Sequence, residues 1–156
     1  MRVLTLSALL VALGCQAAQA GELRLTPSDI TALEPHVAGA GTSGVSGIRT
    51  TVLSGDPSKA GLYTIRLSVP AHTRIAAHAH RDERTAVVVS GTWYFGYGRE
   101  VNDAAKKALP AGSFYSEPAG AAHFAETKDD AVVVYITGVG PTDTVYVDAA
   151  ADPGHH

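Results

Sequence analysis

The chain has 156 residues, with 12 lysines and arginines against 15 aspartates and glutamates, which gives a formal net charge of −3 at pH 7. This length suits one domain with a single core, and the mild negative charge excludes the basic footprint of a nucleic-acid-binding protein. Cys15 is the only cysteine. An internal disulfide and a thiolate cluster are therefore excluded, and any metal site must use histidines and carboxylates.

The first 20 residues are typical of a secretory signal peptide. Arg2 precedes a short apolar run, and Ala18-Gln19-Ala20 forms a small-residue cleavage site. The apolar run is too short for a transmembrane helix. We expect cleavage after Ala20 and export to the periplasm or the medium, with no membrane span. The alternative is a lipoprotein acylated on Cys15, which is less favoured because Ala12 stands where such signals usually carry leucine.

The remaining chain predicts one all-β domain over residues 21–149, followed by a flexible tail over 150–156. Short runs rich in Val, Ile, Thr and Tyr alternate with Gly, Pro and Asp turns, which favours an antiparallel sandwich or barrel. The predicted strands are Ile48–Leu53, Leu62–Val69, Ile75–His80, Thr85–Val89, Thr92–Tyr97, Ser113–Glu117, Ala122–Glu126, Val132–Thr137 and Thr144–Val147.

Two other segments complete the prediction. Residues 36–47 are rich in Gly, Ala and Ser and predict a loop. Only one interior helix is expected, a turn or two over Asn102–Ala108, with the Asn102 side chain as N-cap.

A pair of histidines, His78 and His80, lies within one predicted strand. Side chains at i and i+2 point to the same face of a strand. A third histidine, His123, follows on a later predicted strand and would complete a facial set of imidazole ligands for a transition metal. The pair alone is weak evidence, because exposed histidines on strands are common.

The residues before His123 strengthen this interpretation. They form the pattern Gly112-x5-Pro118-x-Gly120-x2-His123. Gly112 suits a sharp entry into the strand, and Pro118 with Gly120 suits a tight turn before the histidine.

With these two patterns the chain resembles the cupin superfamily, whose members are double-stranded β-helix barrels of the jelly-roll type. Its motifs are G-x5-H-x-H-x3-E-x6-G and G-x5-P-x-G-x2-H-x3-N. The second motif is matched at Gly112, Pro118, Gly120 and His123, with Thr127 where Asn is usual. The first is matched at His78, His80 and Gly91, and it departs at His72, where Gly is usual, and at Arg84, where a glutamate ligand is usual.

The missing glutamate leaves three alternatives open. Glu83, one position early, could reach the metal through a bulge in the Arg81–Glu83 turn. The metal could instead be held by three neutral imidazoles, as the resemblance implies for some non-haem iron oxygenases. In the third alternative the metal site has decayed.

The position of Arg84 bears on the substrate. Two unit charges about 6 Å apart repel by roughly 3 kcal/mol at an effective dielectric near 20. An inward Arg84 beside a metal ion on neutral ligands would therefore favour an anionic substrate, such as a carboxylate or enolate. The alternative is that Arg84 points outward into a surface ion pair with Glu83 or Asp82.

Other candidates carry weaker signals. Tyr115 and Glu117 lie on the strand that leads into the second motif and could supply acid–base chemistry, although packing and surface roles are commoner. Trp93, Phe95 and Tyr97 share one strand face, a pattern more typical of a core or a subunit interface than of a substrate wall.

The resemblance implies a metal-dependent enzyme in which His78, His80 and His123 bind Fe, Mn, Ni or Zn, and oxygenase-type chemistry is favoured within it. Arg84, Glu83 and Tyr115 are the candidate catalytic residues for a small, anionic substrate. The alternatives are a non-catalytic ligand- or metal-binding module and a decayed site in a structural dimer. A homodimer is also implied, because cupins commonly pair through their outer strands.

Overall fold

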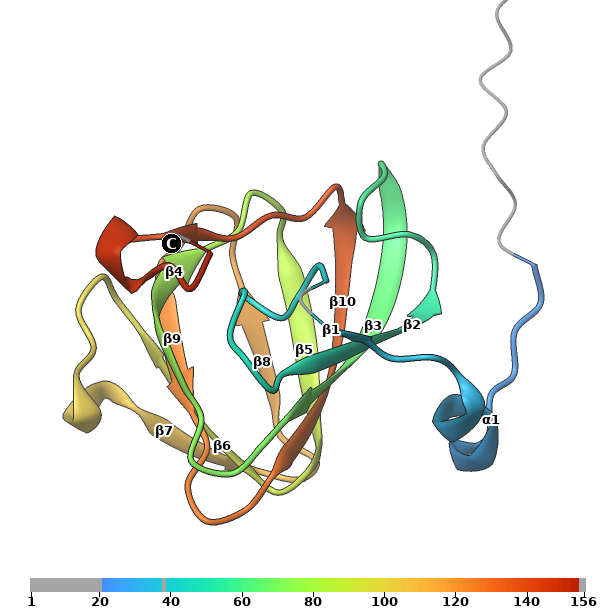
Figure 1. The fold of residues 1–156 in the computed structure, drawn as a ribbon, viewed down its shortest axis with the longest axis horizontal. Helices are drawn as coiled ribbons and strands as arrows, with labels where there is room; N and C mark the ends of the chain where they lie inside the picture. Colours follow the sequence, from blue (N-terminus) through green and yellow to red (C-terminus); the bar gives the residue numbers. More distant parts are fainter. Residues whose placement is uncertain (1–20, 38, 155–156) are drawn as a thin grey trace, which may run out of the picture.

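Two antiparallel sheets face each other and enclose one core in the computed structural model, which describes residues 21–37 and 39–154 (Figure 1). The larger sheet has the order β1 (His36–Val37), β2 (Arg49–Ser54), β3 (Gly61–Val69), β10 (Val132–Gly140), β5 (Arg84–Ser90) and β8 (Phe114–Glu117). The smaller sheet has the order β11 (Val145–Tyr146), β4 (Arg74–Ala79), β9 (His123–Glu126), β6 (Thr92–Tyr97) and β7 (Lys107–Pro110).

The predicted all-β fold is confirmed. All nine predicted strands are present, and their ends differ from the prediction by at most three residues. This agreement follows from side-chain alternation: β3, for example, buries every second residue from Tyr63 to Val69.

The structure corrects the prediction for two segments. The predicted helix over Asn102–Ala108 is a single 3₁₀ turn, η1 (Asp103–Ala105), and the residues after it pair with β6 as β7. Asn102 caps this turn as predicted, since its side chain accepts a hydrogen bond from the Ala104 amide. Within the predicted loop over residues 36–47, His36–Val37 pairs with β2 as β1.

The sequence analysis also missed one helix, α1 (Pro27–Ala32). Its start carries a capping box, in which the Thr26 side chain accepts from the Asp29 amide and the Asp29 carboxylate accepts from the Thr26 amide. Pro27 at the first helical position is pre-organised for a helix. This short helix lies beside the barrel (Figure 1) and buries none of its residues.

The core fills the space between the sheets. Each fully buried aliphatic or aromatic side chain contributes about 1.5–3 kcal/mol relative to an exposed one. The larger sheet supplies Tyr63, Ile65, Leu67, Val69, Val88, Val132, Val134 and Ile136, and the smaller sheet supplies Ile75, Trp93, Phe95 and Ala125. Trp93 and Phe95 are thus core residues, as their shared face predicted, whereas Tyr97 is 52% exposed.

The loop before β2 closes the barrel between its two sheets. Gly41 packs so tightly on the Ile65 side chain of β3 that a Cβ there would lie 2.4 Å from Ile65 Cδ1. Thr42 and Ser43 are buried, and Ser43 reaches His78 near the end of β4. Figure 1 shows this segment, in cyan, between the two sheets.

Thr127, which departs from the second motif, has a structural role. Its hydroxyl donates to the Pro70 carbonyl at 2.6 Å and accepts from the Thr73 amide at 2.9 Å. These bonds tie the end of β9 to the turn that enters β4, the two strands that carry the histidines.

The ends of the chain are only partly described. The predicted signal peptide and Cys15 lie outside the described residues. Among the helices of the described part, none is long and apolar enough to cross a membrane. Near the C-terminus a 3₁₀ turn, η2 (Ala149–Ala151), is capped by Asp148, within the segment where the tail was expected to begin.

Candidate metal centre

His78, His80 and His123 come together inside the barrel. All three are at most 3% exposed, and one ring nitrogen from each lies within 4.8 Å of the others. His78 lies opposite His123 in the pairing of β4 with β9, and His80 follows β4 directly.

A bulge in β4 turns the two histidines inward. Ile75 and Ala77 are buried, so regular alternation would send residues 78 and 80 outward. The register between β4 and β9 instead shifts between Ile75 and His78, and Ala77 and His78 are both buried in succession. The bulge therefore changes the phase of the strand at the site.

Backbone carbonyls fix the orientation of each imidazole ring. Nδ1 of His78 lies 2.8 Å from the Ala76 carbonyl and Nδ1 of His123 lies 3.1 Å from the Ala121 carbonyl, while His80 Nδ1 contacts the Asp143 carbonyl. A carbonyl only accepts, so each Nδ1 carries the proton and each Nε2 presents a lone pair.

Burial keeps these rings neutral. Burial lowers the pKa of His78 to about 4 and the pKa of His80 to about 2, and it also lowers the pKa of His123. Neutral imidazole with a free lone pair is the form that binds a metal ion.

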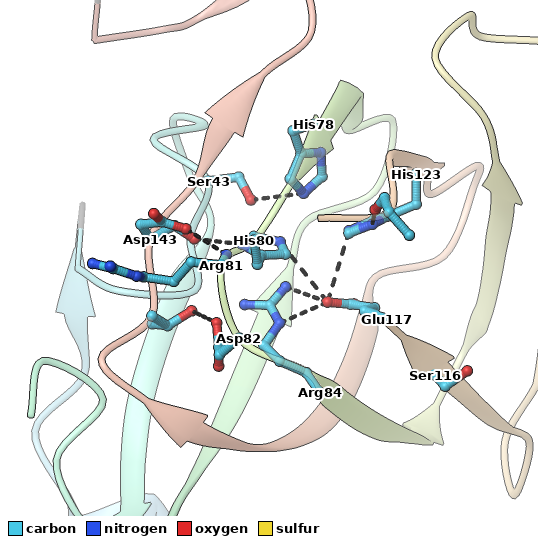
Figure 2. A network of polar contacts seen from close by, with 12 residues as sticks. Ser43, His78, His80, Arg81, Asp82, Arg84, Ser116, Glu117, His123 and Asp143 are labelled. Atoms are coloured by element: carbon cyan, nitrogen blue, oxygen red, sulfur yellow. Dashed lines mark hydrogen bonds and ion pairs between the residues drawn. The ribbon is translucent and has the colours of Figure 1, made fainter. Parts of the chain in front are cut away.

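The loop before β2 adds a hydroxyl to this cluster. Ser43 Oγ lies 3.3 Å from His78 Nε2, and since that nitrogen has no proton, the hydroxyl donates (Figure 2). The Tyr146 hydroxyl in turn donates to the Ser43 carbonyl at 2.6 Å. Ser43 adopts a left-handed backbone conformation with φ of 52°, a strained state that needs such support.

Arg84 is buried and points inward, to a carboxylate on the neighbouring strand. Its Nε donates to Glu117 Oε2 at 2.7 Å, and its Nη2 contacts the same oxygen. Burial raises the pKa of Glu117, but the charge and hydrogen bond of Arg84, together with His123 and His80, outweigh this, and the pKa falls to about 2. Both groups are therefore charged at neutral pH.

Glu117 also faces the histidines. Its Oε2 lies 3.7 Å from His123 Nε2 and 3.8 Å from His80 Nε2 (Figure 2). The sequence analysis named Glu117 but ranked it low. The available signal was its position two residues after Tyr115, which places both on one strand face.

The other two candidate catalytic residues take different positions. Glu83 is exposed, so the structure does not bring its carboxylate to the histidines. Its neighbour Asp82 is buried and accepts from Tyr63 and Thr142 instead. Tyr115 lines the site, and burial raises its pKa well above 10, so its hydroxyl stays protonated.

The donor set fits a divalent transition metal. His80 Nε2 is buried without a hydrogen-bond partner among the described residues, and an unpaired buried acceptor is costly. A metal ion on the three Nε2 atoms would satisfy it. The cavity beside them holds about 20 Å³, room for an ion or a single water, between Ser43, Trp93, Phe95 and Tyr115.

Comparisons with known proteins give a family and a fold. A family model described as "Domain of unknown function (DUF4437)" matches residues 31–151. No curated protein sequence matches the chain.

Solved structures of cupins are similar to this one at low sequence identity. An RmlC-like cupin from Shewanella frigidimarina has 19% identity and a TM-score of 0.56, over 78% of this chain and 93% of that chain. The polyketide cyclase RemF from Streptomyces resistomycificus has 15% identity and a TM-score of 0.67, over 85% and 90%. The DMSP lyase DddQ from Ruegeria pomeroyi has 16% identity and a TM-score of 0.58, over 74% and 61%. These likenesses confirm the cupin fold.

Proposed function

This chain belongs to the cupin superfamily, in the family described as a domain of unknown function (DUF4437), and we propose that it is a metal-dependent enzyme for a small anionic or enolisable substrate. The observation that carries the proposal is that three buried, neutral imidazoles place one ring nitrogen each within 4.8 Å of the others. A purely structural cluster would gain nothing from burying three such acceptors together, since His80 Nε2 is left without a hydrogen-bond partner among the described residues.

His78, His80 and His123 would hold the metal ion through Nε2. When bound, the ion would supply Lewis-acid or oxygen-activating chemistry, and imidazole ligands suit Fe, Ni and Zn, with Mn a further candidate. The protein's own part is to fix the three rings through their Nδ1 protons and to keep water out with Trp93 and Phe95.

The charges around the site support an anionic substrate. Arg84 and Glu117 cancel each other, and the three imidazoles are neutral, so the charge of a divalent ion is left without compensation. Tyr115 lies against Phe95 with ring centroids 4.4 Å apart and carries a protonated hydroxyl at the cavity wall. We propose that this hydroxyl donates a hydrogen bond to bound substrate, with Arg84 orienting Glu117. Glu83 is exposed and takes no part in the proposal.

Within this class we propose oxygenase-type chemistry. The support is the donor set, which suits redox-active iron or nickel, together with mostly apolar walls that limit access of water. RemF is described as a cyclase and DddQ as a lyase. A non-redox reaction is therefore the alternative to oxygenase chemistry. Uptake of dioxygen during turnover distinguishes the two.

The first experiment is metal analysis of protein purified without chelator. We expect about one transition-metal ion per chain, and its loss in H78A and H123A. H36A is the matched control, because His36 is exposed on β1. Metal content that is absent in the wild type, or unchanged in H78A and H123A, would contradict the proposal.

The second experiment is a turnover assay of the metal-loaded protein on small carboxylates, 2-oxo acids and β-diketones in an oxygen electrode. Dioxygen uptake with a member of the panel, lost in H123A, is the expected result. Substrate conversion without uptake would replace the oxygenase class by a non-redox one.

A non-catalytic binding module is the second candidate. The observation that favours it is the size of the cavity, because about 20 Å³ leaves little room for a substrate beside an ion. Tight binding of a small anion to the metal-loaded protein, with no turnover on the panel, would favour this candidate.

We also propose that the protein is exported and forms a homodimer. The support for export is the signal-peptide pattern up to Ala20, and the support for a dimer is the family resemblance. N-terminal sequencing of protein from the native host and light scattering of the purified domain test the two proposals separately.

A further inference from the structure

A buried carboxylate faces the histidines from β8. The first motif would place the glutamate ligand on the neighbouring strand, β5. Arg84 on β5 lies directly opposite Glu117 on β8 in the antiparallel register. Both side chains are 3% exposed and point into the barrel. The charged residues are therefore on the opposite strands from those that the first motif would predict. β5 supplies the cation and β8 supplies the anion, at the same depth in the barrel.

The distances place this carboxylate within the coordination range of one ion. Glu117 Oε2 lies 3.7 Å from His123 Nε2 and 3.8 Å from His80 Nε2. Two ligands about 2.0–2.2 Å from one ion are about 2.8–3.1 Å apart at octahedral angles and about 3.3–3.6 Å apart at tetrahedral angles. A shift of a few tenths of an ångström would satisfy both distances at tetrahedral angles. Figure 2 shows these contacts of Glu117 with His80 and His123.

The contacts of Arg84 leave the carboxylate free to bind an ion as well. A carboxylate has about four lone-pair positions, and the Nε and Nη2 groups of Arg84 both bond to Oε2, so an ion would bind through Oε1 or take the place of one of these two bonds. The remaining positions are available, and the paired guanidinium holds the group in one orientation.

We propose that Glu117 is the anionic fourth ligand of the metal centre and that Arg84 is its positioning residue. This rests on the proposed metal site, and it replaces the ligand that neither Arg84 nor the exposed Glu83 can supply. The competing explanation is that Glu117 serves only as the counter-ion of Arg84.

The variants must remove the carboxylate without leaving Arg84 buried and unpaired, since an unpaired buried charge can unfold the domain. The neutral pair R84Q/E117Q does this. A matched control is K106Q/E126Q, which neutralises another shielded ion pair, with Nζ to Oε2 of 2.8 Å, away from the histidines. Circular dichroism and thermal melts establish that both double variants fold.

The experiment measures Co²⁺ affinity by competition with a chromophoric chelator, together with the visible absorption spectrum of the Co²⁺ protein. We expect R84Q/E117Q to bind Co²⁺ at least about 100-fold more weakly than wild type, with shifted absorption bands, and K106Q/E126Q to match wild type. A folded R84Q/E117Q with wild-type affinity and spectrum would overturn the proposal. In that case loss of Co²⁺ binding in H78A would still support the metal site, whereas full binding in H78A and H123A would overturn the site itself.

Discussion

Two of the histidines are oriented by the same local device. His78 and His123 each donate Nδ1–H to the carbonyl two residues earlier, and the two residues are partners across β4 and β9. His80 depends instead on the Asp143 carbonyl, which is distant in the sequence. A motif that names only the histidines predicts none of these bonds, because two depend on local backbone geometry and the third on a carbonyl 63 residues away.

The lowered histidine pKa values predict how stability of the metal-free protein depends on pH. Below about pH 6.5 an unfolded histidine binds a proton that the buried, folded one does not, so stability is full above this pH and falls as the pH decreases toward 4. His78 and His80 each contribute a loss of about 2 kcal/mol between pH 7 and pH 5, and the lowered pKa of His123 acts in the same direction.

Urea unfolding in the presence of a chelator at pH 7 and pH 5 measures this loss. H123Q should flatten the profile, and H36A should leave it unchanged. An equal free energy of unfolding at both pH values would show that the three rings are not held neutral.

The ion pair between Arg84 and Glu117 predicts a non-additive effect on stability. R84M or E117Q alone leaves one buried charge without a partner and should destabilise the metal-free protein by about 3–5 kcal/mol. The double variant R84M/E117Q should lose far less, because no buried charge remains. A double-mutant cycle with no coupling would contradict the buried pair.

At the scale of elements, the strands could be predicted from the sequence, whereas the features that orient the side chains of the site could not. Apolar and alternating runs predicted nine strands, because strands such as β3 and β10 bury every second residue. The β4 bulge and the pairing of Arg84 with Glu117 depend on register between strands distant in sequence, which tertiary packing decides. This is why Glu117 was ranked low and Glu83 was considered instead.

Gly91 and Gly112, both motif positions, each lie in a turn between two strands, so the effects of substitutions at the two can be compared directly. Both have a left-handed backbone, with φ of 74° at Gly91 and 86° at Gly112. A Cβ at Gly91 would lie 2.4 Å from the Ala131 carbonyl oxygen, whereas, beyond the two neighbouring residues in the chain, no described atom lies within 4 Å of one at Gly112.

G112A should therefore cost about 1 kcal/mol, for the backbone conformation alone, and G91A clearly more. Thermal melts of the two variants check the order. Equal losses would contradict the close approach of the backbone at Gly91.

At the scale of the whole molecule, the barrel encloses a site that only a small ligand can fill. The loop before β2 contacts both sheets, and Tyr146 from β11 holds it through the Ser43 carbonyl. The fold could be predicted from two motifs, because their glycines, proline and histidines fall at fixed places in a cupin barrel. The closure of the barrel by the loop before β2 could not be predicted, because a loop rich in glycine carries no periodic pattern.

Metal binding should stabilise the whole domain. An ion at 100 times its dissociation constant contributes about 2.7 kcal/mol, which corresponds to a rise in Tm on the order of 10 °C for a domain of this size. Thermal melts with Zn²⁺ and with chelator measure this difference, and H78A should abolish it. An equal rise in H78A would assign the stabilisation to another site.

The most direct test of the central claim is the anomalous scattering of a crystal grown from protein purified without chelator. The account predicts one strong peak about 2.0–2.2 Å from Nε2 of His78, His80 and His123. A fully ordered site with no peak among the three rings, or a peak bound elsewhere on the chain, would contradict it.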